Sequence, residues 1–128
     1  MSKDHAEHNE KACTLLRADG QYFDWVVTTA FYSALHFVQN EIFPFTIGRR
    51  SYTCFDNYYN GYFGPGRKPS KHQTTIDLVA SEIRPCTSAY RFLYDTSMTA
   101  RYRKYKVLES IADKAIKELQ IVKDNCSK

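Results

Sequence analysis

The chain has 128 residues, of which 43% are apolar and 25% are charged, and its formal net charge is +4. This length suits one domain that buries a core without metals or disulfides, and the composition excludes a disordered chain. The modest positive charge is compatible with an acidic partner such as RNA but does not by itself predict one. We therefore expect a single domain over residues 1–128.

Signals for export, membrane insertion and metal binding are not visible. The N-terminal segment MSKDHAEHNEK lacks a basic stretch followed by an apolar one, so we expect a cytoplasmic location. The apolar stretch 22–43 contains Asp24, His36 and Glu41, which argue against a membrane helix. The four cysteines are far apart in the sequence, which predicts buried or incidental thiols, no metal and no cofactor.

Residues 2–18 form the first predicted helix, which places Ala6, Cys13 and Leu16 on one side. Asp19 and Gly20 supply its end. The short turn ADGQ then favours an antiparallel hairpin with the next helix.

Residues 22–43 form the longest apolar stretch and predict a largely buried helix without Gly or Pro. Its apolar residues recur at steps of three and four. They are Phe23, Val26, Val27, Ala30, Phe31, Ala34, Leu35, Val38 and Ile42. A polar stripe of Asp24, Thr28, Tyr32, His36 and Asn40 must meet water, a partner or a cleft. Asp24 could orient a catalytic base or cap the helix start, and we favour capping because it lies in the first turn.

Residues 44–70 predict a long loop, since four of the five glycines and two of the four prolines lie between Gly48 and Pro69. The loop 48–69 is rich in aromatic residues interleaved with cations. They are Tyr52, Phe55, Tyr58, Tyr59, Tyr62 and Phe63, with Arg49, Arg50, Arg67 and Lys68. Such rings could stack on unpaired bases, but we favour packing onto the rest of the protein or a dimer interface.

Three further helices are predicted. The first spans residues 71–83 with Ser70 as its cap, the second runs from about residue 87 to 105, and the third from about 107 to 122. No strand pattern competes with them. The predicted fold is therefore all-α, an antiparallel bundle of four or five helices with a long aromatic loop between the second and third.

The order of these segments is similar to that of a known superfamily. HAEHNEKACTLL, YFDWVVTTAFYSALHFV, a helix opening with KHQ, and YRFLYDTSMTARY together resemble the HEPN superfamily, named for higher eukaryotes and prokaryotes nucleotide-binding domains. The resemblance covers roughly residues 4–121. It implies an antiparallel helical bundle that forms a homodimer. It also implies either a metal-independent RNase of a toxin–antitoxin pair or defence system, with a nucleotidyltransferase antitoxin as a possible partner, or a domain that binds RNA, a nucleotide or protein.

The family's nuclease pattern is an Arg, a polar residue, four to six further residues and a His. In this chain no His follows Arg91, Arg101 or Arg103. The segment from Arg67 to His72 has the spacing but straddles a loop and a helix start, so we interpret it as coincidence.

A related form of the pattern ends in Tyr, and Tyr102 or Tyr105 would stand there. Ser97 occupies the place of the leading Arg, however. The standard nuclease chemistry of the family is therefore not predicted for this chain.

Cleavage of RNA through its own 2′-hydroxyl requires a base, an acid and a cation near the phosphate. Arg101, His72 and His36 are the candidate catalytic residues. The alternative is that His36 is a hydrogen-bonded core residue and that His72 caps a helix or is simply exposed.

The densest run of basic and aromatic residues in the chain spans residues 101–106. The candidate residues for RNA or nucleotide binding are Arg91, Arg101, Tyr102, Arg103, Lys104 and Tyr105. The alternative is a solvated helix end whose cations lie near the negative end of the helix dipole.

Three functional hypotheses remain. The first is a binding domain for RNA or a nucleotide, and the second is a divergent metal-independent RNase. The third is a protein-interaction module that uses the aromatic loop as its contact surface.

Overall fold

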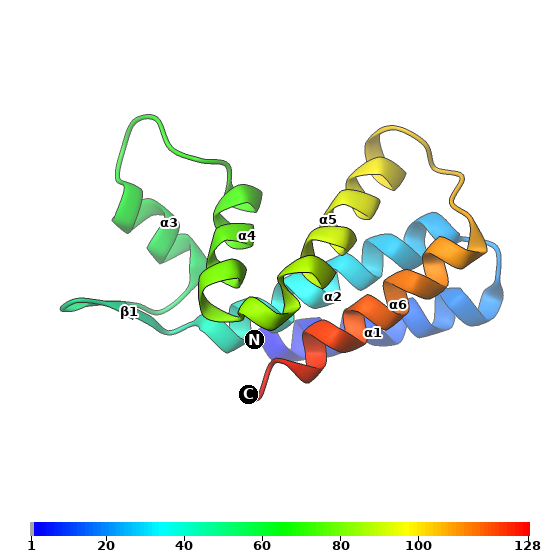
Figure 1. Cartoon of the computed structure of the whole chain (residues 1–128), viewed down its shortest axis with the longest axis horizontal. Coiled ribbons are helices and arrows are strands. Elements are labelled where there is room, and N and C mark those ends of the chain that lie inside the picture. The colour runs from blue at the N-terminus through cyan, green and yellow to red at the C-terminus, as the bar shows by residue number, and fades with distance from the viewer. Residues whose placement is uncertain (1) are drawn as a thin grey trace.

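Six α-helices make up most of the chain in the computed structural model, which describes residues 2–128. In chain order the elements are α1 (Ser2–Asp19), α2 (Phe23–Ile42), β1 (Phe45–Ile47), β2 (Arg50–Tyr52), α3 (Phe55–Phe63), α4 (Lys71–Glu82), the 3-10 turn η1 (Arg84–Cys86), α5 (Thr87–Tyr102) and α6 (Glu109–Asp124) (Figure 1). The predicted all-α class is confirmed in this broad sense. Among the described residues, no helix is long and apolar enough to span a membrane.

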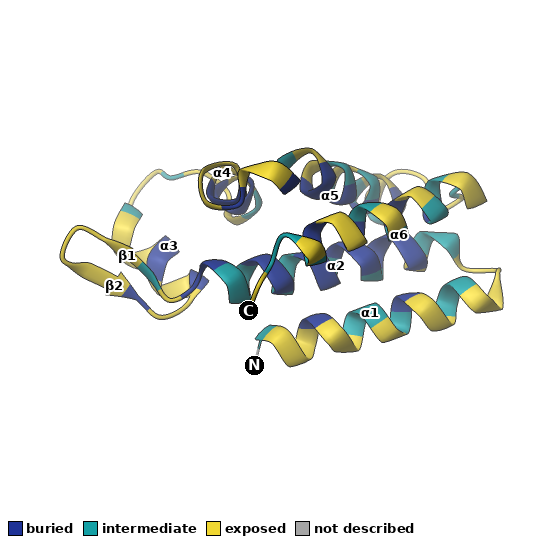
Figure 2. Cartoon of the chain, turned by 60° about the horizontal axis from the view of Figure 1, so that its bottom comes forward, coloured by how far each residue is buried: buried dark blue, intermediate teal, exposed yellow. Residues whose placement is uncertain are grey.

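Helix α2 is the centre of the bundle, because α1, α5 and α6 all pack against it. Figure 2 shows it between α1 and α5, with the buried residues on the sides that face other helices. The predicted apolar face of α2 is buried except at Phe23 and Leu35, which are half-buried. The three- and four-residue periodicity therefore identified the core face correctly.

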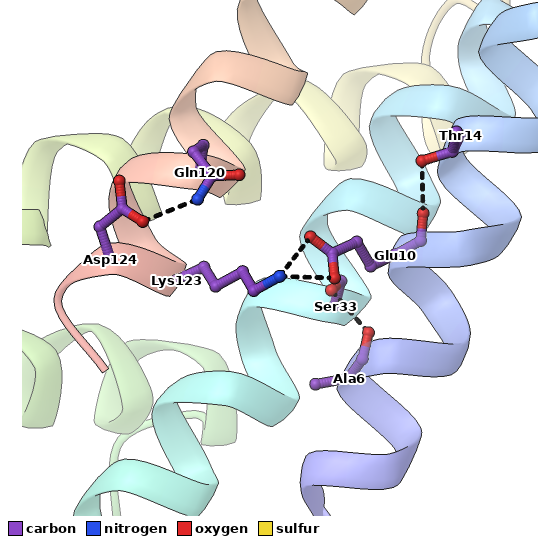
Figure 3. Close-up of polar contacts among 7 residues, drawn as sticks. All are labelled: Ala6, Glu10, Thr14, Ser33, Gln120, Lys123 and Asp124. Carbon is purple, nitrogen blue, oxygen red and sulfur yellow. Dashed lines mark hydrogen bonds and ion pairs between the residues drawn. The ribbon is translucent and has the colours of Figure 1, made fainter. Parts of the chain in front are cut away.

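Polar contacts attach α1 to its two neighbours (Figure 3). The buried hydroxyl of Ser33 on α2 donates a 2.7 Å hydrogen bond to the carbonyl oxygen of Ala6. Nζ of Lys123 on α6 lies 3.1 and 3.2 Å from the two carboxylate oxygens of Glu10. These contacts join α1, whose buried residues are Ala6 and Cys13, to α2 and α6.

The predicted long loop is wrong in part, because residues 45–63 form regular structure. Strands β1 and β2 pair antiparallel, with Thr46 opposite Ser51, and helix α3 follows. Gly48 has a φ of +59° in the turn between the strands, a conformation that glycine adopts without strain. This segment therefore adds a hairpin and a sixth helix to the predicted four or five.

Aromatic packing explains why this segment folds. The ring of Tyr58 lies 5.5 Å from that of Phe45, 5.4 Å from that of Tyr52 and 6.1 Å from that of Phe43. Four of the six aromatic residues predicted in the loop are buried, namely Tyr52, Phe55, Tyr58 and Tyr59. Buried rings cannot stack on bases, so the packing interpretation holds for these four.

The boundaries of the later helices shift by a few residues. The predicted cap of α4 is confirmed, since the Oγ of Ser70 accepts a 3.0 Å hydrogen bond from the backbone N of Gln73. Helix α5 ends at Tyr102 instead of 105, and α6 begins at Glu109 instead of 107. Residues 103–106 are all exposed, so no burial holds them in a helix.

Candidate functional site

Arg101, in the last turn of α5, is held against α2. Its Nη1 donates a 2.7 Å hydrogen bond to the hydroxyl of Tyr32, and its guanidinium lies 5.2 Å from the centre of the Tyr32 ring and 5.9 Å from that of Phe31. None of the ion pairs among the described residues involves Arg101. Its Nε and Nη2 also donate within α5, to the carbonyl oxygen of Ser97 and the sulfur of Met98, each at 3.4 Å. One N–H on each terminal nitrogen remains without a partner among the described residues, and a half-buried guanidinium of this kind without a carboxylate partner is suited to binding an anion such as phosphate.

His72, in the first turn of α4, lies beside the same aromatic residues. Its ring centre is 5.0 Å from that of Tyr94 and 5.9 Å from that of Phe31. Burial, and secondarily the positive charge of Arg101, lower the pKa of His72. The fold thus brings two of the predicted catalytic residues to one aromatic cluster, with a His that is neutral at pH 7.

His36, the third predicted catalytic residue, lies elsewhere. Its ring stacks on that of His5 from α1, with centres 3.7 Å apart and planes at 20°. Burial, followed by the neighbouring His5, lowers the pKa of His36 to about 4. Its contacts join α1 to α2 and do not place it with Arg101 and His72.

Four large aromatic side chains are exposed near the start of α2 and the end of α5. The exposed fractions are 70% for Tyr102, 68% for Tyr105, 53% for Trp25 and 50% for Tyr22. Arg103, Lys104 and Lys106 are also exposed. We call the set of Tyr22, Trp25, Arg101, Tyr102, Arg103, Lys104, Tyr105 and Lys106 the basic aromatic surface. Exposed rings beside cations are what unpaired nucleobases stack on.

Two of the pockets beside the last turns of α5 contain an arginine. The first, the Trp25 pocket, has a volume of about 190 Å³ and is lined by Asp24, Trp25, Thr28, Ala100, Arg101 and Tyr105. The second, the Tyr102 pocket, has a volume of about 480 Å³ and is lined by Tyr94, Asp95, Met98, Thr99, Tyr102 and Arg103. Each pocket therefore combines an exposed tyrosine with an arginine.

Asp24 does not cap α2, so that prediction is wrong. The helix begins at Phe23, so Asp24 lies inside its first turn, where a negative charge is favourable. Within residues 2–128 the Asp24 carboxylate forms no hydrogen bond and no ion pair; only its backbone carbonyl accepts one, from the hydroxyl of Thr28 at 2.8 Å. Asp24 instead lines the Trp25 pocket and the neighbouring pocket that contains Tyr22 and Lys106.

The remaining predicted residue, Arg91, is exposed on α5 and lines neither pocket. It lies roughly 15 Å along the helix from Arg101. Sequence reasoning thus identified the α5 part of the surface but missed Tyr22 and Trp25. The sequence did contain a signal for these two residues, because both are bulky and aromatic but lie off the predicted apolar face of residues 22–43. Among the described residues, no three potential metal ligands cluster.

Three comparisons with known proteins were made. A scan against models of protein families found no match. Searches of curated proteins and of solved structures found no significant match. The functional interpretation therefore depends on the residues and the geometry of this chain.

Proposed function

We propose that this protein binds single-stranded RNA through the basic aromatic surface. The observation that carries the proposal is the placement of Arg101, whose guanidinium is oriented by Tyr32 and has no carboxylate partner among the described residues. An oriented guanidinium can donate two parallel hydrogen bonds to a phosphate group. Arg101 would therefore hold the RNA backbone.

The surrounding residues support a single strand over a duplex. Trp25, Tyr102 and Tyr105 are each at least half exposed. Trp25 and Tyr105 line the Trp25 pocket with Arg101, and the ring centre of Tyr102 lies 5.1 Å from the guanidinium of Arg101. Aromatic side chains stack on unpaired bases, which a duplex keeps within its own stack. The exposed Arg103, Lys104 and Lys106 would add attraction for neighbouring phosphates.

The test is fluorescence anisotropy with a labelled unstructured RNA oligonucleotide across a salt titration. The wild-type protein should bind with an affinity that falls as salt rises, and Arg101→Ala should weaken binding and make the salt slope shallower by about 0.7. Arg84→Ala is the matched control, because this exposed arginine lies at the opposite end of α5 in η1. Absence of salt-dependent binding by the wild-type protein would refute the proposal and favour a protein-interaction module.

The resemblance to HEPN domains agrees with this proposal, since members of that superfamily bind RNA or nucleotides. It extends the proposal to a homodimer that acts in a toxin–antitoxin or defence system beside a nucleotidyltransferase. Light scattering of the purified protein tests the homodimer independently of RNA binding.

A second candidate function is metal-independent cleavage of RNA. It is favoured by the position of His72 and Arg101, whose side chains lie against the same ring, that of Phe31. His72 in its neutral form would accept the proton of the attacking 2′-hydroxyl, and Arg101 would stabilise the negative charge that develops on the phosphate. The protonated His72 or water would then give a proton to the 5′-oxygen as its bond to phosphorus breaks. Such cleavage would leave a 2′,3′-cyclic phosphate and a 5′-hydroxyl.

This second candidate is tested by incubating labelled RNA with the protein and excess chelator. Cleavage should be lost in His72→Ala and in Arg101→Ala, while both variants keep the helical circular dichroism of the wild-type protein. His36→Ala is the control, because His36 contacts His5 on α1. No cleavage over the full wild-type concentration range would exclude a free-standing RNase.

A further inference from the structure

We infer that the Trp25 pocket is a nucleobase subsite that selects guanine, with Asp24 as the residue that reads the base. This inference rests on the proposed RNA binding and deepens it. The pocket brings together one carboxylate, one guanidinium and two exposed aromatic rings, contributed by α2, α5 and the segment after α5. No single element of the chain contains this combination.

The walls of the pocket suit a flat aromatic ligand. Trp25 from α2 is 53% exposed and Tyr105 from the segment after α5 is 68% exposed, so both rings can be reached from the solvent. A base can stack on either ring, and indole offers the larger face. Arg101 lines the same pocket and would bind the phosphate attached to that base.

Asp24 supplies the selectivity. An ionised carboxylate only accepts hydrogen bonds, and among residues 2–128 no side chain donates one to Asp24. The hydroxyl of Thr28, which lines the same pocket, donates to the backbone oxygen of Asp24 and not to its carboxylate. No side chain of the described residues therefore competes with a ligand for the carboxylate oxygens of Asp24.

Guanine matches two adjacent acceptors better than the other bases do. Its Watson–Crick edge presents N1–H and N2–H side by side, which can donate to the two oxygens of one carboxylate. Adenine, cytosine and uracil each place an acceptor next to a donor on that edge, so one carboxylate oxygen would face a lone pair. Asp24 also repels every phosphate equally, so its charge weakens RNA binding of all sequences unless it contacts the base.

The experiment compares uridine oligonucleotides that carry one central G, A, C or U, using anisotropy. The oligonucleotide with G should bind roughly tenfold more tightly than the one with U, as expected for a good bidentate base contact. Trp25 is the only tryptophan of the chain, so its fluorescence reports the stacking directly and should be quenched most by the G oligonucleotide.

Asp24→Asn is the deciding variant. Asn presents a donor where Asp24 has an acceptor, so the ratio of G to U affinity should fall close to one, although loss of the negative charge leaves binding to U unchanged or stronger. Asp19→Asn is the matched control, since this exposed carboxylate lies at the end of α1 and lines neither pocket. It removes the same charge and should keep the preference for G.

Competition with GMP and AMP distinguishes a strand from a free nucleotide. Displacement of the oligonucleotide by GMP but not AMP supports the subsite and identifies a guanine nucleotide as sufficient. Failure of both to compete, with the preference for G intact, supports the subsite for a strand only. Equal binding of all four oligonucleotides, or a preference for G that survives Asp24→Asn, would overturn the inference and leave RNA binding in place. Absence of binding to every oligonucleotide would remove the proposed function itself.

Discussion

The hydroxyl of Tyr32 accepts a 2.7 Å hydrogen bond from Nη1 of Arg101, which joins the middle of α2 to the last turn of α5. This bond and the stacking on the Tyr32 ring hold the guanidinium against the surface of the bundle. Arg101 is therefore more ordered than a cation on a free helix end. We therefore expect the contact between Tyr32 and Arg101 to affect both the stability of the fold and the proposed RNA binding.

Tyr32→Phe removes the hydroxyl and keeps the ring. We expect the free energy of unfolding to fall by about 1 kcal/mol, because one partly exposed hydrogen bond is lost. RNA affinity should fall as well, but less than in Arg101→Ala, because the cation remains. Urea unfolding and anisotropy measure the two effects. Unchanged RNA binding in Tyr32→Phe would show that the hydrogen bond does not orient Arg101 for its ligand.

Phe31 and Trp25 lie on the same helix but differ in burial. Substitution of Phe31 should therefore lower the stability of the fold, whereas substitution of Trp25 should lower RNA affinity. Phe31 is fully buried and contacts His72, Tyr90 and Tyr94, so Phe31→Ala should destabilise the fold by about 3–5 kcal/mol. Trp25 is mostly exposed, so Trp25→Ala should change stability by roughly 0.5 kcal/mol while it weakens RNA binding.

Urea unfolding separates the two effects because it requires no ligand. The result that contradicts this assignment is a Trp25→Ala protein that is as unstable as Phe31→Ala. In that case Trp25 would be part of the core and not of the binding surface.

The stacked pair of His5 and His36 predicts a loss of stability in acid. Folding lowers the pKa of His36 to about 4 from its ordinary value of 6.5, mainly by burial, so the unfolded chain binds a proton more readily. This contribution is fully present above pH 6.5 and is lost as the pH falls toward 4. Thermal unfolding across this window should show a steeper decline in Tm for the wild-type protein than for His36→Gln.

The control for the acid prediction is His8→Gln. His8 is exposed on α1, so this variant should keep the wild-type pH profile. A profile of His36→Gln that follows the wild-type curve throughout would assign the acid sensitivity to other groups.

Two buried hydroxyl groups should respond to removal in opposite ways. The hydroxyl of Tyr90 is buried and has no hydrogen-bond partner within the described residues, so Tyr90→Phe should stabilise the fold by about 1 kcal/mol or more. The hydroxyl of Ser33 donates to Ala6, so Ser33→Ala should destabilise it by about 1 kcal/mol. Chemical denaturation of both variants gives the comparison, and a destabilised Tyr90→Phe would contradict the assignment.

Much of the fold could be predicted from the sequence because helix periodicity is a local signal. The core face of α2 and the cap at Ser70 both follow from residues three or four positions apart. The segment 45–63 could not be predicted in the same way. Its glycines indicated a loop, whereas the packing of Phe43, Tyr52 and Tyr58 holds a hairpin and a helix together.

The candidate site likewise has a part that local sequence signals predicted and a part that depends on tertiary packing. The sequence by itself determined that a run of cations and tyrosines lies at the end of α5 and just after it, and it predicted Arg101 and His72 as candidate catalytic residues. Only the tertiary structure decided that Arg101 meets Tyr32, that His72 joins them and His36 does not, and that Asp24 and Trp25 complete a pocket. The physical reason is that the composition and spacing of residues report the properties of one helix at a time. Contacts between α2, α4 and α5 instead depend on how three buried faces pack around Phe31.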